Sequence, residues 1–361
     1  MKKKICFIYN PISGTTGKRM ILSQINSKLD KDLYEYKVEK TGYAGHATEL
    51  AKQAVADGFD IVCAIGGDGT VNEVGRALIG TSVALAIIPC GSGNGLARHL
   101  HIPIDPIHAI EFINDCSIRR MDYGIIDEHV FFCTCGVGFD AFISQKFAKS
   151  RYRGPLAYIE NILKNGLNYN PETYELEIVD EQEQKSVHKA FLISCANASQ
   201  YGNNLYIAPQ ASVRDGLLDV TILEPFTVID APQIAIQMMN GTIDQNSRIN
   251  TFRCKSLAIH RQGEGVIHFD GDPVQAGKEI NVSIVPKGIY CLCPRKEGVY
   301  DVVDNIHYTV MEQLGLIQMR SEEFVRINKR TNRKLMELNK DIIKKVIPSN
   351  GLKVKNNRKK K

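Results

Sequence analysis

The chain lacks an apolar run long enough to cross a membrane, and it lacks the N-terminal apolar segment of a signal peptide. The uncharged run Ala77–Ala97 is interrupted by Pro89 and by the loop-forming residues from Gly91 to Asn94, whereas a spanning helix needs about 20 mostly apolar residues. Only Ile5–Tyr9, five residues, separate the N-terminal lysines from Asn10, which is too short for a signal sequence. We therefore expect a cytoplasmic protein without a membrane span.

The ten cysteines lack the paired spacing of a zinc site. The two closest pairs, Cys133/Cys135 and Cys291/Cys293, are each separated by one residue inside apolar, strand-like runs. Alternate residues of a strand share a face. Each pair is therefore predicted to point together into a core as reduced thiols, which fits a reducing compartment.

An excess of charge of one sign is absent from most of the chain. Residues 1–300 carry 30 Lys and Arg against 33 Asp and Glu, whereas residues 301–361 carry 15 against 7. A nearly neutral body does not suit a nucleic-acid-binding protein, so we expect no nucleic-acid partner, and any anionic partner would contact the basic C-terminal segment. A length of 361 residues favours about two domains.

Residues 1–121 alternate short apolar strands with helical patterns. The expected strands are Ile5–Tyr9, Tyr34–Val38, Ile61–Ile65 and Val83–Ile88; the expected helices are one ending near Leu29, then Gly45–Ala56, Thr70–Ile79 and Pro106–Ile113. Short apolar strands between helices predict an α/β domain with a parallel sheet covered on both faces. Ligands of such sheets bind beyond the carboxyl ends of the strands.

Residues 122–298 show many strand patterns close together, with Gly, Asp or Asn between them, which predicts a largely antiparallel β-rich second domain. The expected strands are Val130–Cys135, Tyr174–Val179, Ala190–Cys195, Leu218–Leu223, Ser256–His260, Val266–Phe269, Ile280–Val285 and Ile289–Cys293. Two helices, Asp140–Ala148 and Leu156–Leu167, are expected among them.

Residues 299–361 are predicted to form a basic helical extension. Seven residues recur at steps of three or four along one helix face: Phe324, Ile327, Thr331, Leu335, Leu338, Ile342 and Val346. The extension could contact an anionic membrane surface, at about 1 kcal/mol per basic residue. It could also pack its apolar face against protein, including a second copy in a homodimer. We prefer packing against protein slightly, because apolar helix faces are most often buried that way.

Three glycine-containing loops each follow a predicted strand and precede a predicted helix: Asn10–Gly14, Gly66–Glu73 and Pro89–Gly95. Glycines let the backbone approach a ligand closely, and helix N-termini offer free N–H groups to an anion. Because the carboxyl ends of parallel strands meet at one edge, the three loops predict a phosphate-binding cradle there. Neither the spacing of a P-loop nor G-x-G-x-x-G is present.

Two acidic features stand out beside the loops. Asp68 lies among the glycines of the second loop, where a carboxylate suits a Mg²⁺ ion or an acceptor hydroxyl better than bare phosphate; the simpler interpretation is a tight turn capped by Asp68. Asp270-Gly271-Asp272 follows the strand Val266–Phe269. One of its carboxylates could hold water or metal while the other takes a proton, and the alternative is an ordinary hairpin turn with solvated acids.

These motifs, taken in order, resemble the catalytic domain of diacylglycerol and sphingosine kinases over about residues 1–295. The motifs are N-P-x-S-G from Asn10, Thr41 with Gly45-His46-Ala47, GGDGT-x-N-E from Gly66, P-x-G-S-G-N from Pro89, Gly136-Val137-Gly138-Phe139-Asp140-Ala141, Ala208-Pro209 with Asp215-Gly216, and Asp270-Gly271-Asp272. GGDGT alone is shared with NAD kinases and phosphofructokinases, whereas the ordered set is specific.

The resemblance implies that ATP binds between the two domains and that its γ-phosphoryl group is transferred to a lipid hydroxyl. The implied nucleotide contacts are Asn10, Pro11, Ile12, Ser13, Gly14, Thr41, Gly67, Asp68, Gly69, Thr70, Val71, Asn72, Glu73 and Ser92. The family's usual general base is the Glu of a D-G-E turn, and Asp272 stands at that position here. Asp68 would help to orient the hydroxyl or the metal.

Further residues are carried over by motif. Asp140 matches an Asp beside the lipid head group in sphingosine kinases, and its simpler interpretation is a helix N-cap. In soluble bacterial lipid kinases a structural Mg²⁺ lies near an Asp-Gly turn. Asp215 matches its carboxylate, and Ser212 and Leu217 match positions that offer backbone carbonyls.

The lipid and two rival functions stay open at this stage. The third loop reads S-G-N-G-L-A-R, which is closer to the sphingoid-base and ceramide kinase form, so a long-chain base such as dihydrosphingosine is preferred mildly over diacylglycerol. An NAD kinase would need a polar cleft, whereas six aromatic residues are available to line an apolar groove: Phe131, Phe132, Phe139, Phe142, Phe147 and Tyr158. An inactive nucleotide-binding regulator is the other alternative, because Asp replaces Glu at residue 272.

Overall fold

The computed structural model describes residues 2–13, 18–148, 169–179, 184–227 and 229–295. The predicted helix Leu156–Leu167 and the whole extension after residue 298 lie outside the described residues. The first part of the chain alternates strands and helices: β1 (Lys3–Tyr9), α1 (Lys18–Lys28), β2 (Tyr34–Lys40), α2 (His46–Ala56), β3 (Ile61–Gly66), α3 (Asp68–Leu78), β4 (Ala84–Pro89), α4 (Gly95–His99) and α5 (Pro106–Asn114).

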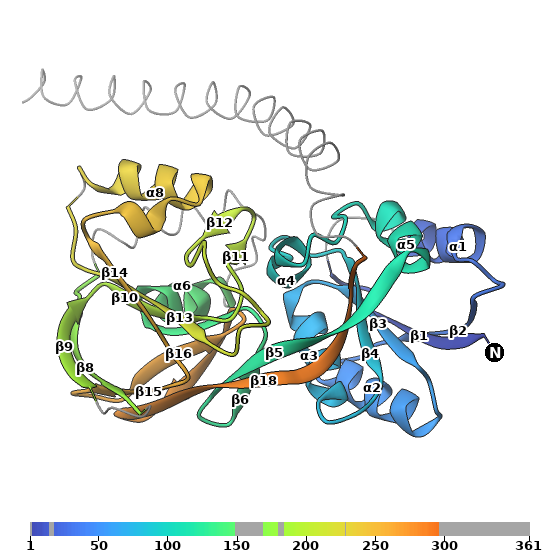
Figure 1. Cartoon of the computed structure of the whole chain (residues 1–361), viewed down its shortest axis with the longest axis horizontal. Coiled ribbons are helices and arrows are strands. Elements are labelled where there is room, and N and C mark those ends of the chain that lie inside the picture. The colour runs from blue at the N-terminus through green and yellow to red at the C-terminus, as the bar shows by residue number, and fades with distance from the viewer. Residues whose placement is uncertain (1, 14–17, 149–168, 180–183, 228, 296–361) are drawn as a thin grey trace, which may run out of the picture. The chain divides into compact units, whose positions relative to one another are not determined.

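The strands of this first part form a parallel sheet in the order β2-β1-β3-β4. Every residue of β3 and β4 is buried, as expected for parallel strands covered on both faces. Helices α2 and α3 lie on one side of the sheet and α1 and α5 on the other (Figure 1). The predicted α/β fold is confirmed.

The second part is built mainly from antiparallel strands. Its elements are β5 (Cys116–Ile126), β6 (His129–Phe131), β7 (Thr134–Gly138), α6 (Phe139–Ala148), β8 (Glu172–Ile178), β9 (Gln184–Ala190), β10 (Leu192–Ala196), β11 (Gln200–Gly202), β12 (Leu205–Tyr206), β13 (Leu218–Leu223), α8 (Ala231–Asn240), a 3₁₀ turn (Ile243–Gln245), β14 (Ile249–Cys254), β15 (Ser256–Arg261), β16 (Gly265–Phe269), β17 (Asp272–Ala276) and β18 (Glu279–Pro294).

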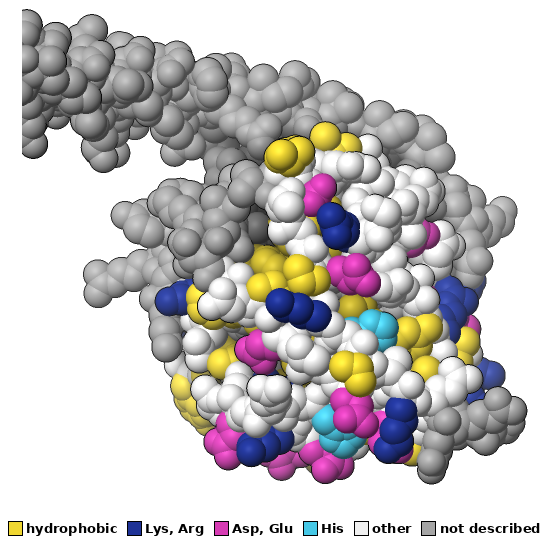
Figure 2. Space-filling view, turned by 90° about the vertical axis from the view of Figure 1, so that its left-hand side faces the viewer, with side chains coloured by type: hydrophobic (Ala, Val, Ile, Leu, Met, Phe, Trp, Pro, Cys, Tyr) yellow, Lys and Arg dark blue, Asp and Glu magenta, His cyan; other side chains and the backbone are white. Residues whose placement is uncertain are grey.

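Six of these strands form one sheet in the order β14-β13-β10-β7-β16-β17. Strands β11 and β12 pair with each other, and the others extend the parallel sheet of the first part through β18, β15, β8 and β9, with β5 and β6 alongside. The antiparallel second sheet confirms the predicted β-rich second part. On the face shown in Figure 2, charged side chains of both signs are interspersed with hydrophobic ones.

Strand β18 connects the two parts. Its first residues pair with β15, and its last residues pair with β5 and, through Tyr290 and Cys291, with β4 (Figure 1). The sequence predicted two separate strands, Ile280–Val285 and Ile289–Cys293. That prediction was wrong, because Lys287 adopts a positive φ of 53° within an irregularity of the ladder between Val285 and Ile289, and the strand continues beyond it.

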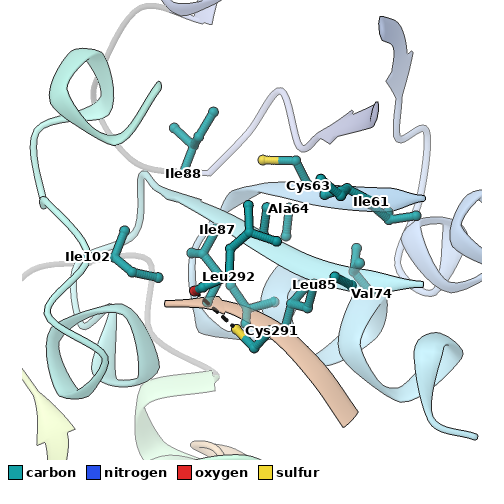
Figure 3. Close-up of a cluster of buried hydrophobic side chains, with 14 of the residues drawn as sticks. Ile61, Cys63, Ala64, Val74, Leu85, Ile87, Ile88, Ile102, Cys291 and Leu292 are labelled. Atoms are coloured by element: carbon teal, nitrogen blue, oxygen red, sulfur yellow. Dashed lines mark hydrogen bonds between the residues drawn. The ribbon is translucent and has the colours of Figure 1, made fainter. Parts of the chain in front are cut away.

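The main core lies around the parallel sheet. Side chains of β3, β4 and α3 pack with Cys291 and Leu292 of β18 in one cluster (Figure 3). A second cluster fills the space between the two sheets of the second part, and a third lies around α6 and α8. All ten cysteines are free, and nine of them are buried.

Other local expectations need correction. The predicted strand Val130–Cys135 is divided into β6 and β7, because Phe132 and Cys133 donate their N–H groups to Asp270 instead of continuing a ladder. Cys133 consequently packs in the first core and Cys135 in the second, so this pair does not share one core. Cys291 and Cys293 do share one. Several elements were not predicted from the sequence: α4, β5, β9, β11, β12, β14, β17 and α8.

Candidate active site

The three glycine-containing loops leave the same edge of the parallel sheet, as predicted. They follow β1, β3 and β4, and backbone hydrogen bonds join them: Asn10 donates to Ile65 O at 3.1 Å, and Cys90 donates to Gly66 O at 2.8 Å. The Nδ2 of Asn10 lies 3.4 Å from Thr70 Oγ1 in the second loop. The loops therefore form one connected rim at the carboxyl ends of the strands.

Asp68 connects the second loop to the third. Its Oδ2 accepts the N–H of Asn94 at 2.9 Å, and its Oδ1 accepts the N–H of Gly95 at 2.7 Å. These are donors at the start of α4, which have no partner within their own helix. Burial raises the pKa of Asp68, and the two N–H groups oppose that rise. The observed contacts position the third loop; the catalytic role of Asp68 stays a prediction.

The other residues predicted to contact nucleotide fall into two groups. Asn10, Pro11, Ile12, Gly67, Gly69 and Ser92 are exposed or half-buried along the rim, whereas Ser13, Thr41, Thr70, Val71 and Asn72 are buried; Gly14 lies outside the described residues. Glu73 is half-buried, and its carboxylate accepts the N–H groups of Gly45 and Ala47 at 2.9 and 3.1 Å. Glu73 thereby holds the start of α2 against α3.

The two acids of the turn after β16 have different surroundings. The carboxylate of Asp270 accepts Asn72 Nδ2 at 2.9 Å and the N–H groups of Phe132 and Cys133 at 2.9 and 2.8 Å. It therefore joins α3 to the β6–β7 connection. Burial raises the pKa of Asp270 to about 6. Asp270 and Gly271 both have positive φ, 47° and 87°, which forms the tight turn.

Asp272 is exposed at the start of β17, and the charged groups of α3 act on it. Partial burial raises the pKa of Asp272, the nearby carboxylate of Glu73 raises it further, and the guanidinium of Arg76 lowers it. The charged groups that act most on Asp272 therefore belong to Glu73 and Arg76 of α3. A carboxylate with a raised pKa can accept a proton more readily at neutral pH.

A pocket lies between the third loop and the second part of the chain. Its walls come from both parts: Asp68, Ser92, Gly93, Cys133, Thr134, Asp140, Ser144, Tyr201, Gly202, Asn203, Leu205, His268, Asp270 and Gly271. The aromatic residues expected to line an apolar groove are absent from these walls. Phe131, Phe132 and Phe139 are buried in the cores, Phe142 packs against the third core, and the side chains of Phe147 and Tyr158 lie outside the described residues.

Asp140 is buried at this pocket. Its Oδ2 accepts His268 Nε2 at 3.0 Å and the Tyr201 hydroxyl at 3.2 Å, and its Oδ1 accepts the N–H of Ala141 at 2.8 Å. The helix α6 begins at Phe139, so the position of Asp140 near a helix start was predicted correctly. Its partners could not be predicted, because His268 is 128 residues away along the chain.

The predicted magnesium ligands gather at a turn before β13. Asp215 is exposed, and its Oδ1 accepts the N–H of Leu217 at 3.1 Å. Asp219 lies near enough to Asp215 for the second charge to raise its pKa, after burial as the larger cause. The Oδ2 of Asp219 is buried without a hydrogen-bond partner in the described part of the chain.

The turn offers few side-chain ligands for a metal ion, and the guanidinium of Arg253 already lies 2.9 Å from Asp219 Oδ1 and 3.9 Å from Asp215 Oδ2. The magnesium site therefore stays a prediction. Mg²⁺ is usually held by one or two carboxylates together with water or phosphate oxygens, and Asp215 with the carbonyls of Ser212 and Leu217 could supply such a set. Within the described residues, no group of three or more His, Cys, Asp or Glu side chains could hold a metal ion.

Comparison with known proteins now identifies the family. Residues 4–126 match the model of the diacylglycerol kinase catalytic domain, and residues 133–293 match that of the YegS C-terminal NAD kinase beta sandwich-like domain. A diacylglycerol kinase of Mycobacterium tuberculosis is 30% identical over 302 residues, which cover 81% of this chain and 96% of that protein. The chain belongs to the diacylglycerol kinase catalytic-domain family.

Two further similar proteins support the family and the fold. A probable lipid kinase of Chromohalobacter salexigens is 28% identical over 65% of this chain and 77% of its own length. The crystal structure of a putative diacylglycerol kinase from Bacillus anthracis has the same fold, with a TM-score of 0.64 and 22% identity over 81% of this chain and 98% of that one. This member of the diacylglycerol kinase family is therefore a lipid kinase, a phosphotransferase, as the resemblance predicted. No described helix has the length and apolar character needed to cross a membrane.

Proposed function

We propose that the protein transfers the γ-phosphoryl group of ATP to a hydroxyl group of a lipid, either a diacylglycerol or a sphingoid base such as dihydrosphingosine. The observation that carries this proposal is the convergence of three glycine-containing loops on one edge of the sheet, the second and third of which are joined by Asp68. The exposed carboxylate of Asp272 stands at the start of β17, under the influence of the charges of Glu73 and Arg76 on α3. Family membership supports the same reaction class.

The glycine-containing loops are proposed to position the phosphates of ATP and to neutralise their charge. Positioning and neutralisation of charge dominate the catalysis of phosphoryl transfer. The N–H groups of Asn94 and Gly95 at the start of α4 already donate to Asp68, so the N–H groups at the start of α3 are the ones proposed to meet the phosphates. The predicted nucleotide contacts that are exposed or half-buried on this rim, including Asn10 and Ser92, remain the proposed binding residues. Gly69 at the start of α3 has no atom within 4 Å of an added Cβ in the described structure, which leaves space for a ligand beside it.

Asp272 is the proposed general base. Its carboxylate would take the proton of the lipid hydroxyl, the hydroxyl oxygen would form a bond to the γ-phosphorus, and the bond between that phosphorus and the bridging oxygen would break to release ADP. Mg²⁺ bound with the phosphates would neutralise their negative charge. The turn of Ser212, Asp215 and Leu217 is the proposed structural magnesium site.

The test is transfer of radiolabelled γ-phosphate from ATP to a panel of acceptors in mixed micelles, comprising dioctanoylglycerol, dihydrosphingosine and, without micelles, NAD. We expect a labelled lipid and no labelled NAD. Asp272→Asn should lower the rate by about 10²–10⁴-fold and leave ATP affinity unchanged by calorimetry, whereas Asp272→Glu should retain activity.

Three results would each contradict a part of this proposal. Labelled NAD without labelled lipid would assign the protein to NAD phosphorylation. Calorimetry that detects no binding of Mg·ATP to the wild-type protein would remove the nucleotide site altogether. Equal rates for the wild-type protein and Asp272→Asn would remove Asp272 as the base and leave the reaction itself standing.

A further inference from the structure

The buried carboxylate of Asp140 is already occupied by donors from the protein. A carboxylate offers about four lone-pair sites, and here Oδ2 accepts both His268 Nε2 and the Tyr201 hydroxyl while Oδ1 accepts the N–H of Ala141. The side chains of Asp140 and His268 are 4% and 2% exposed. A charge buried this completely is stable only when it is paired, and His268 is its partner.

The hydrogen in this contact belongs to His268. An ionised carboxylate has no hydrogen to give, so Nε2 carries the proton whether the imidazole ring is neutral or positively charged. The opposite ring nitrogen, Nδ1, is buried and has no hydrogen-bond partner in the described structure. His268 therefore binds Asp140 through Nε2, while its Nδ1 has no partner in the described structure.

The pair lies in a polar row across the second sheet. His268 of β16 and Ser194 of β10 are both register partners of Gly136 in β7. A Cβ built on Gly136 would come within 2.6 Å of Asp140 Oδ2, so the absence of a side chain lets the carboxylate approach the row. Like His268 Nδ1, Ser194 Oγ is buried without a partner in the described residues.

We infer that His268 sets the head-group specificity of the pocket by occupying Asp140, so that the pocket selects a neutral, hydroxyl-bearing glycerolipid over a positively charged long-chain base. This inference rests on the proposed lipid kinase function. An ammonium group gains most from a carboxylate that is free to pair with it, and it can only donate hydrogen bonds. A hydroxyl group carries no charge and can also accept hydrogen bonds, so it depends less on a free Asp140 carboxylate.

The S-G-N-G-L-A-R loop favours a long-chain base by its sequence, whereas the contacts of Asp140 favour a glycerolipid. That preference used a local sequence likeness in the third loop, whereas the pocket beside it is closed by residues from β7, α6 and β16. His268 is a specificity-determining residue on this account, and it acts through Asp140.

The experiment compares kcat/KM for dioctanoylglycerol and dihydrosphingosine in the same mixed micelles. The wild-type protein should prefer dioctanoylglycerol. His268→Phe keeps a ring but frees Asp140, so the ratio of the two kcat/KM values should move toward dihydrosphingosine by about tenfold or more, given the strength of hydrogen bonds to charged groups. His268→Gln, whose amide can donate in place of Nε2, should restore the wild-type ratio.

Two controls separate specificity from folding. His188→Gln changes an exposed histidine on β9 whose partner is Ser186, and its ratio should equal that of the wild type. Tyr201→Phe removes the second donor of Asp140 with little change in shape, and its ratio should move in the same direction as that of His268→Phe. A purely structural role of His268 would lower both rates together and leave the ratio unchanged, which would overturn the inference.

A spectroscopic readout keeps the inference separate from the proposed function. In protein labelled with ¹⁵N-histidine, the His268 signals should show a protonated Nε2, and micelles containing dioctanoylglycerol should shift them while micelles containing dihydrosphingosine should not. This outcome would support the inference even if no lipid were phosphorylated, which would overturn only the proposed function. Shifts caused by dihydrosphingosine alone, or by neither lipid, would overturn the inference.

Discussion

Gly67 and Gly91 touch through their backbones, and this contact sets the distance between the second and third glycine loops. A Cβ added to Gly91 would come within 2.5 Å of Gly67 Cα and within 2.9 Å of Asn94 Oδ1. Neither neighbour can yield easily, because one is backbone and the other is hydrogen-bonded to Gly91 itself, with the N–H of Gly91 donating at 2.9 Å.

Gly91→Ala should therefore separate the two loops. We expect overpacking to lower the free energy of unfolding by about 1–3 kcal/mol and ATP affinity to fall by more than tenfold, as measured by urea denaturation and by calorimetry. Gly263→Ala is the matched control, since an added Cβ there has nothing within 4 Å in the described structure. Equal ATP affinity in Gly91→Ala and wild type would show that loop spacing does not matter for binding.

Asp68→Asn tests the link between the second loop and α4. The amide keeps one acceptor oxygen where the carboxylate offers two, so the N–H of Asn94 or that of Gly95 loses its partner. A buried donor without a partner costs about 1–3 kcal/mol, and we expect that loss in urea denaturation together with a raised KM for ATP. Asp57→Asn, at an exposed carboxylate that accepts only Gln53 Nε2 at 2.7 Å, should behave like wild type. A KM that stays at the wild-type value would contradict the proposed role.

Arg76→Gln tests the charge environment of Asp272. The Arg76 guanidinium lowers the pKa of that carboxyl group, so its removal should raise the pKa. A general base acts only when deprotonated, and the acid limb of the kcat/KM profile against pH should therefore move to higher pH. Arg76→Lys, which keeps the positive charge, should leave the limb near its wild-type position. Movement to lower pH in Arg76→Gln would exclude Asp272 as the group that controls this limb.

The raised pKa of Asp270 predicts a pH dependence of stability. Its pKa is about 6 in the folded protein against an ordinary value of 3.8, so between these values the folded state binds more protons than the unfolded state. Stability from this group is greatest at low pH and falls as the pH rises through this interval. The difference in unfolding free energy between wild type and Asp270→Asn, from urea denaturation at several pH values, should fall over the same interval. A difference that is constant with pH would show that Asp270 keeps an ordinary pKa.

The features that could be predicted are those that depend on residues close together in the sequence. Glycine loops between strands and helices are local patterns, so all three were located, and the parallel order of β1, β3 and β4 follows from the same alternation. The partners of Asp68 and Asp140 could not be predicted, because Gly95 and His268 are 27 and 128 residues away and come close only in the folded sheet.

The misread part of β18 has a physical explanation of the same kind. Pro286 and Gly288 are typical turn residues, and they predicted the end of a strand. In the fold, the carboxylate of Asp122 accepts two backbone N–H groups: Oδ1 accepts that of Lys287 at 2.6 Å, and Oδ2 accepts that of Gly216. This buried carboxylate accepts the N–H group that the irregular backbone leaves out of the ladder, and pairing with β5 resumes at Ile289.

The course of β18 through both parts has a mechanical consequence. Because one strand is hydrogen-bonded to β15 near its beginning and to β4 near its end, strands of the second part continue the parallel sheet that carries the glycine loops. Movement of the two parts relative to one another would therefore have to bend this shared sheet or break its hydrogen bonds.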